Sequence, residues 1–161
     1  MKHLYKSLLV MMLLLGSFTL NAATDVPNIK LPGLHGEEVD LTKLTGKVVY
    51  LDFWASWCAP CLRSFPWMKS IKARYQEQGL EIVAVNLDKQ RKLADAFLER
   101  VEVNFQVAFD STGDTAALYK LRGMPSSFLI GRDGKLYATH VGFRDKDKPE
   151  IEAAIKRLLE L

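Results

Sequence analysis

Alternating hydrophobic and polar positions divide the chain into strands and helices. Two apolar runs rich in β-forming residues, 47–53 and 80–87, predict strands that are buried on both faces. Between them, the spacing of apolar residues predicts a helix over about 59–78, which Gly79 ends. The apolar positions of this helix recur at threes and fours: Leu62, Phe65, Met68, Ile71 and Tyr75.

The second half of the chain continues the same alternation. Residues 89–101 predict an amphipathic helix whose apolar face carries Leu93, Phe97 and Val101. Shorter elements follow: a strand at 105–109, a helix at 115–121, strands at 126–130 and 135–141, and a final helix after Asp147. A short edge strand at 38–41 precedes the first buried strand. This order implies an α/β fold with a mixed central β-sheet, helices on both faces and a short N-terminal β extension.

Residues 1–23 have the pattern of a secretory signal peptide. Two lysines give a positive start, an apolar run spans 8–15, and Ala22 and Ala23 offer a cleavage point. The run is shorter than the roughly 20 residues of a membrane span, but counting on through Leu20 brings it close. A retained N-terminal membrane anchor is therefore the alternative, and a single domain is expected over 24–161.

Composition excludes several classes of protein. Hydrophobic residues make up 48% and charged residues 25%, as in a soluble globular protein. The 22 basic and 19 acidic residues are too evenly balanced for a nucleic-acid clamp. No Gly-rich phosphate loop is present, so no nucleotide cofactor is expected. Export would place the domain in the periplasm, where paired cysteines oxidise unless a donor keeps them reduced.

The two cysteines, Cys58 and Cys61, lie where a buried strand gives way to a helix. A structural cross-link this short would contribute only about 1.9 kcal/mol through loop entropy. A zinc site would need further ligands, and His35 and His140 do not stand at a recognisable ligand spacing. Haem attachment requires histidine directly after the second cysteine, where this chain has Leu62. The favoured interpretation is a reversible dithiol/disulfide couple, with no metal and no other cofactor.

The position of the pair also indicates which cysteine attacks the partner and which resolves the mixed disulfide. Cys58, at the helix start, lies near unpaired backbone N–H groups and the positive end of the helix dipole, which favour its thiolate. We expect Cys58 to attack a partner disulfide and the more shielded Cys61 to resolve the mixed disulfide. Pro60 suits the first helical turn, and Ala59 adds no charge between the cysteines.

The segment 49–61, which contains Trp-Cys-Ala-Pro-Cys, resembles the active site of the thioredoxin superfamily. The signal-like leader, a longer insert before the third main strand and the segment 123–130 resemble its TlpA/ResA-like periplasmic branch. Pro66 and Pro125 match two further elements of the family in order, and the resemblance covers about residues 36–160. It implies a thioredoxin-like fold and an exported thiol-disulfide oxidoreductase.

The resemblance also implies roles for single residues. Pro125 would be a cis proline that faces the cysteines and leaves the backbone of Met124 free to pair with a bound peptide, beside Trp57. Asp52 would be a buried acid beneath the cysteines that takes a proton from Cys61. From the residues alone, a turn proline at 125 and a solvated strand-end aspartate at 52 remain the alternatives.

The expected function is reduction of disulfides in protein substrates. The resemblance implies a membrane electron donor of the thiol-reducing type and cytochrome c maturation as one task. An oxidant or isomerase that introduces disulfides is the enzymatic alternative. A carrier that holds Cu(I) on the two thiolates is the alternative from a different class.

Overall fold

A computed structural model describes residues 24–161, so the predicted signal peptide or anchor lies outside the described residues. The main sheet has six strands in the spatial order β1-β8-β7-β4-β5-β6. Their bounds are β1 Thr24–Asp25, β8 Lys135–Val141, β7 Ser126–Ile130, β4 Val48–Trp54, β5 Leu80–Asn86 and β6 Gln106–Phe109. Strand β4 is parallel to β5 and antiparallel to β7, which confirms the predicted mixed sheet.

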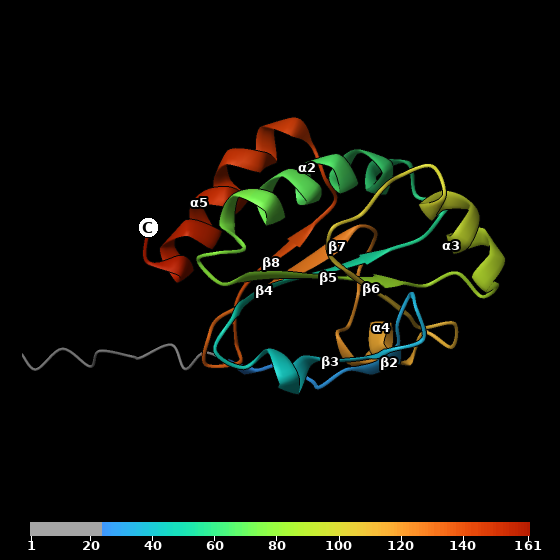
Figure 1. The fold of residues 1–161 in the computed structure, drawn as a ribbon, viewed down its shortest axis with the longest axis horizontal. Coiled ribbons are helices and arrows are strands. Elements are labelled where there is room, and N and C mark those ends of the chain that lie inside the picture. Colours follow the sequence, from blue (N-terminus) through green and yellow to red (C-terminus); the bar gives the residue numbers. More distant parts are fainter. Residues whose placement is uncertain (1–23) are drawn as a thin grey trace, which may run out of the picture.

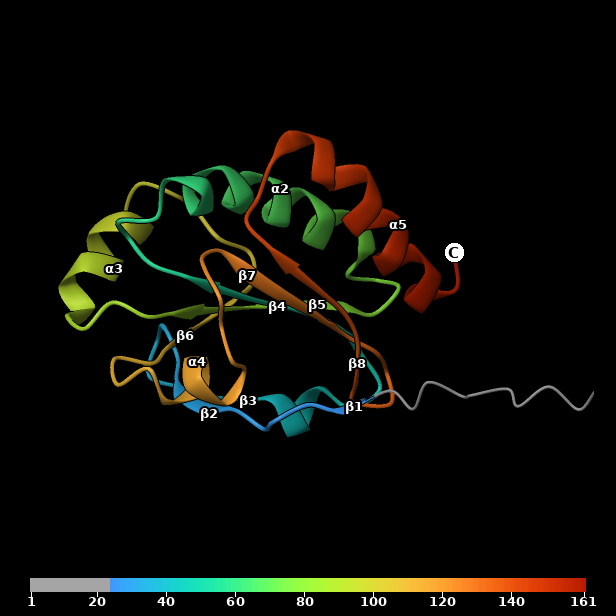
Figure 2. The ribbon, with the colours of Figure 1, turned by 180° about the vertical axis from the view of Figure 1, so that it is seen from behind.

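Helices and a small hairpin cover the two faces of the sheet (Figures 1 and 2). One face packs against α2 (Ala59–Tyr75), α3 (Arg91–Leu98) and α5 (Lys148–Leu159). The other face packs against α4 (Asp114–Leu118) and against the hairpin of β2 (Lys30–Pro32) and β3 (Glu38–Asp40). The N-terminal hairpin is the predicted β extension. No helix within residues 24–161 has the length and apolar character to cross a membrane.

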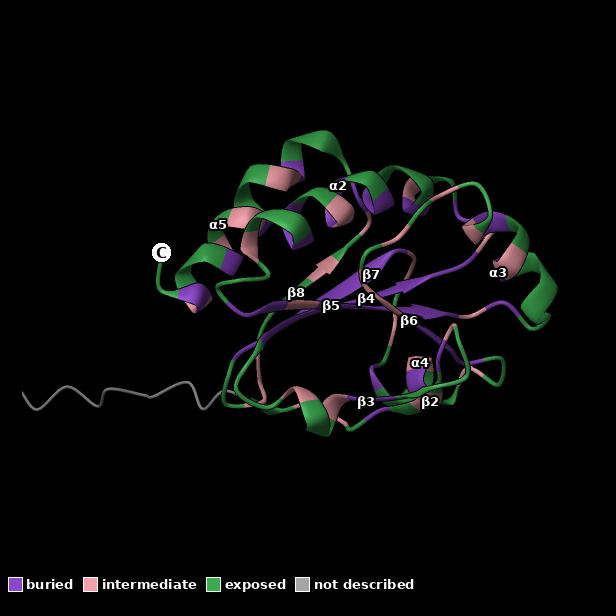
Figure 3. Ribbon diagram, in the orientation of Figure 1, coloured by how far each residue is buried: buried purple, intermediate pink, exposed green. Residues whose placement is uncertain are grey.

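Strand β4 lies at the centre of this arrangement, and all seven of its residues are buried (Figure 3). Successive side chains of a strand point to opposite faces, so β4 contributes to both cores. Trp54 points toward α2 and α3, where its ring lies 4.9 Å from that of Phe65 and 4.6 Å from that of Phe97. Phe53 points the other way and contacts Tyr119, the residue that directly follows α4.

Three predicted helices differ from the structure in their limits, and the one predicted at 115–121 is observed as α4 at Asp114–Leu118. Helix α2 ends at Tyr75, because the next residues form tight turns in which Gln78 N–H bonds the Tyr75 carbonyl. The Arg132 guanidinium binds the Gln78 carbonyl at 2.8 Å and fixes this turn. Helix α3 spans only eight residues, and the prediction that Leu93 lies on its buried face is wrong: Leu93 is 43% exposed, whereas Ala94 and Phe97 are buried.

Replacing Phe97 with alanine tests this orientation of α3. Phe97 packs against two aromatic rings in the core, so the variant should lose about 3–5 kcal/mol of unfolding free energy. Leu93→Ala on the exposed face of the same helix should change it by only about 0.5 kcal/mol. Urea unfolding of the oxidised proteins measures both, and equal losses would contradict the orientation.

Candidate active site

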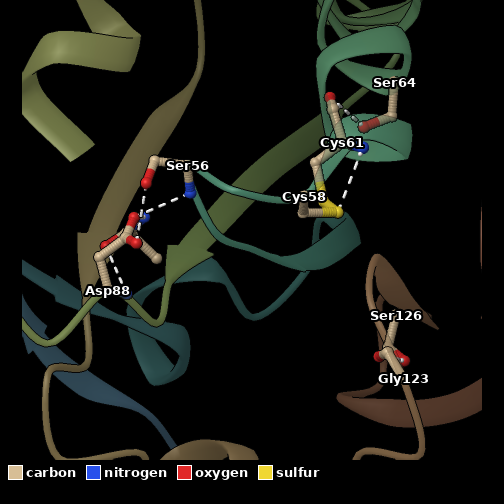
Figure 4. The surroundings of a disulfide bond; sticks show 8 residues. Ser56, Cys58, Cys61, Ser64, Asp88, Gly123 and Ser126 are labelled. Carbon is tan, nitrogen blue, oxygen red and sulfur yellow. Dashed lines mark hydrogen bonds between the residues drawn. A yellow bond between two sulfur atoms is a disulfide. The ribbon is translucent and has the colours of Figure 1, made fainter. Parts of the chain in front are cut away.

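Cys58 and Cys61 form a disulfide at the start of α2, after the short loop that follows β4 (Figure 4). Cys58 is the N-cap residue, and its sulfur accepts a hydrogen bond from the Cys61 N–H at 3.3 Å. This bond and the helix dipole would favour a thiolate at Cys58 when the pair is reduced. Only 4% of the Cys58 surface is exposed, so Cys58 is less accessible than the sequence suggested. Cys61 is completely buried, so Cys58 is still the more accessible of the two cysteines.

A hydrogen-bond network fixes the loop that leads into Cys58. The Asp88 carboxylate accepts hydrogen bonds from the backbone N–H and the hydroxyl of Ser56, both at 2.9 Å (Figure 4). Asn86 donates to the same carboxylate at 2.8 Å, and Leu87 N–H donates to the Trp54 carbonyl. The network ties the loop after β4 to the end of β5, so the first cysteine starts from a fixed backbone.

Sequence reasoning did not single out Ser56 or Asp88. One signal was available, because polar residues that follow two neighbouring parallel strands meet at the same edge of a sheet. Asp88 comes directly after the second buried strand, and Ser56 comes after the first.

An apolar groove of about 540 Å³ opens beside the disulfide. None of its lining side chains is charged: Trp57, Cys58, Ala59, Pro60, Leu87, Ala116, Leu121, Gly123 and Met124. Trp57 forms an exposed wall, with 69% of its surface open to solvent. The structure therefore brings Trp57 and Met124 together with Cys58 in one groove, and their role in substrate binding stays a prediction. Leu87, Ala116 and Leu121 were missed, because only the folded chain carries these segments to the redox pair.

Pro125 directly follows Gly123 and Met124, which line this groove. The Met124–Pro125 peptide bond is cis, which is the conformation that the family resemblance implied. The Pro125 carbonyl accepts a hydrogen bond from Gly142 N–H at 2.8 Å, and the Ser126 hydroxyl donates to the Gly123 carbonyl at 2.7 Å. These bonds fix residues 123–126 next to the groove. A role of Pro125 in substrate binding stays a prediction.

Asp52 lies within β4 and is 1% exposed, so the interpretation as a solvated strand-end residue is wrong. Burial raises the pKa of its carboxyl group well above the usual value, and Oδ2 has no hydrogen-bond partner among the described residues. The side chain shares the α2 face of the sheet with Tyr50 and Trp54, and Cys61 packs in the core on that face. Burial also raises the pKa of Tyr50, and the Asp52 charge makes a second, smaller contribution in the same direction.

The two histidines of the described chain lie apart from the cysteines in sequence and element. His35 stands in the loop of the N-terminal hairpin, and His140 is on β8. Among residues 24–161, no three or more His, Cys, Asp and Glu side chains gather in a way that could hold a metal ion.

The sequence matches the Redoxin family over residues 21–155. Thiol-disulfide oxidoreductase ResA of Bacillus cereus is 33% identical over 134 residues, which cover 83% of this chain and 76% of the relative. ResA of Bacillus subtilis is 34% identical over 127 residues, which cover 79% of this chain and 71% of that relative. A Chlorobium tepidum protein of known crystal structure, provisionally identified as thiol:disulfide interchange protein DsbE, aligns with a TM-score of 0.83 and 50% identity, covering 85% of this chain and 96% of that one.

Replacing Asp52 with asparagine should increase the stability of the variant relative to that of the wild type as the pH rises. A carboxyl group whose folded pKa exceeds its unfolded value binds more protons in the folded state, so stability falls as pH rises above the ordinary value of 3.8. Asparagine removes this dependence. Measured by urea unfolding, the stability of the variant minus that of the wild type should grow by about 1 kcal/mol or more between pH 4 and pH 8.

Asp110→Asn is the matched control, because it should behave in the opposite way. Burial acts to raise the pKa of Asp110, but hydrogen bonds from Thr115, Thr112 and Gly113 outweigh it and lower the pKa. The wild type therefore gains stability as Asp110 ionises, so the deficit of this variant should grow as the pH rises toward 3.8 and should change little between pH 4 and pH 8. An Asp52→Asn difference that is independent of pH, or that follows the control, would contradict the assigned environment of Asp52.

Proposed function

The chain belongs to the Redoxin family of the thioredoxin superfamily and is a thiol-disulfide oxidoreductase similar to ResA and DsbE, and we propose that it reduces protein disulfides in the periplasm. The apolar groove beside Cys58 is the observation that supports proteins, rather than small molecules, as the substrates. Its uncharged lining and the exposed Trp57 ring suit an extended peptide with apolar residues beside the cysteine under attack.

The proposed reaction begins at Cys58. Its thiolate attacks one sulfur of a partner disulfide, forms a mixed disulfide and releases the other partner sulfur as a thiolate. The Cys61 thiol then gives its proton to the Asp52 carboxylate and attacks the Cys58 sulfur. This second step forms the Cys58–Cys61 disulfide and releases the second partner thiolate. Two electrons pass from the cysteine pair to the partner.

The buried environment of Asp52 supports this assignment. An ordinary carboxylate is a weak base toward a thiol, because its pKa lies far below that of cysteine. Burial brings the pKa of Asp52 closer to that of a thiol, which makes proton transfer from Cys61 more favourable.

The direction and compartment of the reaction are the further parts of the proposal. The signal-like pattern of residues 1–23 supports export, either with cleavage or with a retained anchor. Oxidising surroundings would consume the dithiol, so a membrane electron donor of the thiol-reducing type must restore it. The cysteine thiols of apocytochrome c are candidate substrates, which would place the protein in cytochrome c maturation.

The redox state of the pair in cells tests the direction. Acid quenching followed by alkylation of free thiols should find Cys58 and Cys61 mostly reduced in the cell that makes the protein. Loss of the membrane donor should shift the pair to the disulfide. A pair that is mostly oxidised in normal cells would favour the oxidant or isomerase instead.

Replacing Cys61 with serine should trap partners. Nothing then resolves the intermediate, so mixed disulfides through Cys58 should accumulate and be visible on non-reducing gels. Cys58→Ser is the reciprocal variant and should trap few partners. Abundant adducts through Cys61 in that variant would reverse the two roles.

The Cys61→Ser variant can also test whether the groove binds the partner. Leu121→Asp, added to Cys61→Ser, places a charge in the apolar lining and should reduce the trapped protein by about tenfold, whereas a small disulfide should react nearly as before. Leu118→Asp is the control, because Leu118 lies on α4, is 56% exposed and does not line the groove. Equal trapping by the two double variants would contradict peptide binding in the groove.

A further inference from the structure

Three polar side chains form a row across neighbouring strands. Asp52 on β4 is paired directly with Ser127 on β7, and Ser127 is paired directly with His140 on β8. Directly opposite residues point to the same face of a sheet, with β-carbons about 4.5–5.5 Å apart. The row therefore leads from the centre of the sheet, where Asp52 is buried, to the His140 side chain, which is 28% exposed.

The two ends of this row carry buried polar atoms without a hydrogen-bond partner. Only three such side-chain atoms occur within residues 24–161, and they are Asp52 Oδ2, Trp54 Nε1 and His140 Nε2. His140 Nε2 lies 3.4 Å from Asp147 Oδ2, but the two atoms do not have hydrogen-bond geometry. Buried polar groups almost always bond to protein or water, so Asp52 and His140 are suited to bind water.

A cavity of about 140 Å³ lies at the Ser127–His140 end of the row, and Ser127 stands between it and Asp52. Ser127 and His140 line it, together with Tyr50 of β4 and Ile151 of α5. A water molecule needs roughly 10–15 Å³ of such space and two or more polar partners, so the cavity can hold a short water chain. Its lining shares no residue with the apolar groove beside Cys58.

We propose that Ser127, His140 and water in this cavity form a proton path between Asp52 and solvent, separate from the substrate groove. The inference rests on the proposed function, in which Asp52 takes a proton from Cys61. The serine hydroxyl can accept one proton and donate another, and imidazole can do the same at its two ring nitrogens. The Asp52 O–H bond breaks, the proton moves along the row to His140, and His140 releases a proton to solvent. No electrons move in this step.

The path matters because a bound protein partner covers the groove at Cys58. Asp52 is buried, so without another route its proton would remain until the partner leaves. A path that opens beside α5 lets Asp52 return to its ionised form while the partner is still bound.

The charges that face His140 support this role. Asp147 lies beside its ring, and Glu150 and Arg157 of α5 line the cavity. The Asp147 carboxylate is held by Arg144 at 2.9 Å, which fixes a negative charge beside the imidazole ring. Burial keeps the pKa of Tyr50 high, so its hydroxyl stays neutral and can donate a hydrogen bond to water.

Stopped-flow measurement of mixed-disulfide resolution tests the path. The fully reduced protein reacts with insulin, as a protein disulfide, and with a small aromatic disulfide that leaves the groove open. Ser127→Ala and His140→Gln should each slow resolution on insulin by about tenfold and flatten its pH dependence, with less than about a twofold effect on the small disulfide. His35→Gln, the same change at an exposed histidine, should leave both rates unchanged.

Asp52→Asn completes the design, because it separates the path from the proposed function. It should slow resolution itself, and adding His140→Gln to it should cause no further loss. Equal slowing of both disulfides, or slowing that persists in the Asp52→Asn background, would overturn the path. Normal rates in Ser127→Ala and His140→Gln, with a slow Asp52→Asn, would also overturn it and leave the role of Asp52 intact. A normal rate in Asp52→Asn would refute the proposed function of Asp52.

Discussion

The complete burial of β4 is the constraint on which the rest of the structure depends. This strand pairs with β5 on one side and β7 on the other, and its alternate side chains supply both cores. Asp52 is the exception in an otherwise apolar or aromatic strand, and its carboxyl group loses water without gaining a charged partner. Burying an unpaired charge is costly, so the carboxyl favours its neutral form. A group of this kind is poorly suited to holding a fold together and well suited to exchanging a proton.

The same strand positions the redox pair. Strand β4 ends at Trp54, the Ser56–Asp88 hydrogen bonds hold the following loop, and the polypeptide turns into α2 with Cys58 as its N-cap. Rigid elements thus fix the positions of the sulfurs. The groove combines residues at the start of α2 and in α4 with residues of the loops at 57–58, 87 and 121–124. A fixed redox centre beside an apolar groove suits a protein that performs the same disulfide exchange on partners of different sequence.

Much of this could be predicted from the sequence, because local patterns determine it. Apolar runs located the buried strands, and the spacing of Cys58 and Cys61 after a strand placed them at a helix start. The burial of Phe97 was predicted, but the exposure of Leu93 could not be, since both side chains are apolar and only packing separates them. The row from Asp52 through Ser127 to His140 depends on strand register across two pairings, which a hydrophobic pattern within one strand does not specify.

The central claim is that Asp52 is a buried carboxyl group that stays protonated far above the usual range. Carbon-13 NMR titration of its side-chain carboxyl in the oxidised protein measures this directly. Asp40 serves as an internal reference, because hydrogen bonding from the Thr42 hydroxyl lowers its pKa to about 2, with the Thr42 N–H and Lys30 adding to the effect. We expect Asp52 to titrate well above about 3.9, the ordinary value for aspartate. Titration of Asp52 at or below that value would contradict the account.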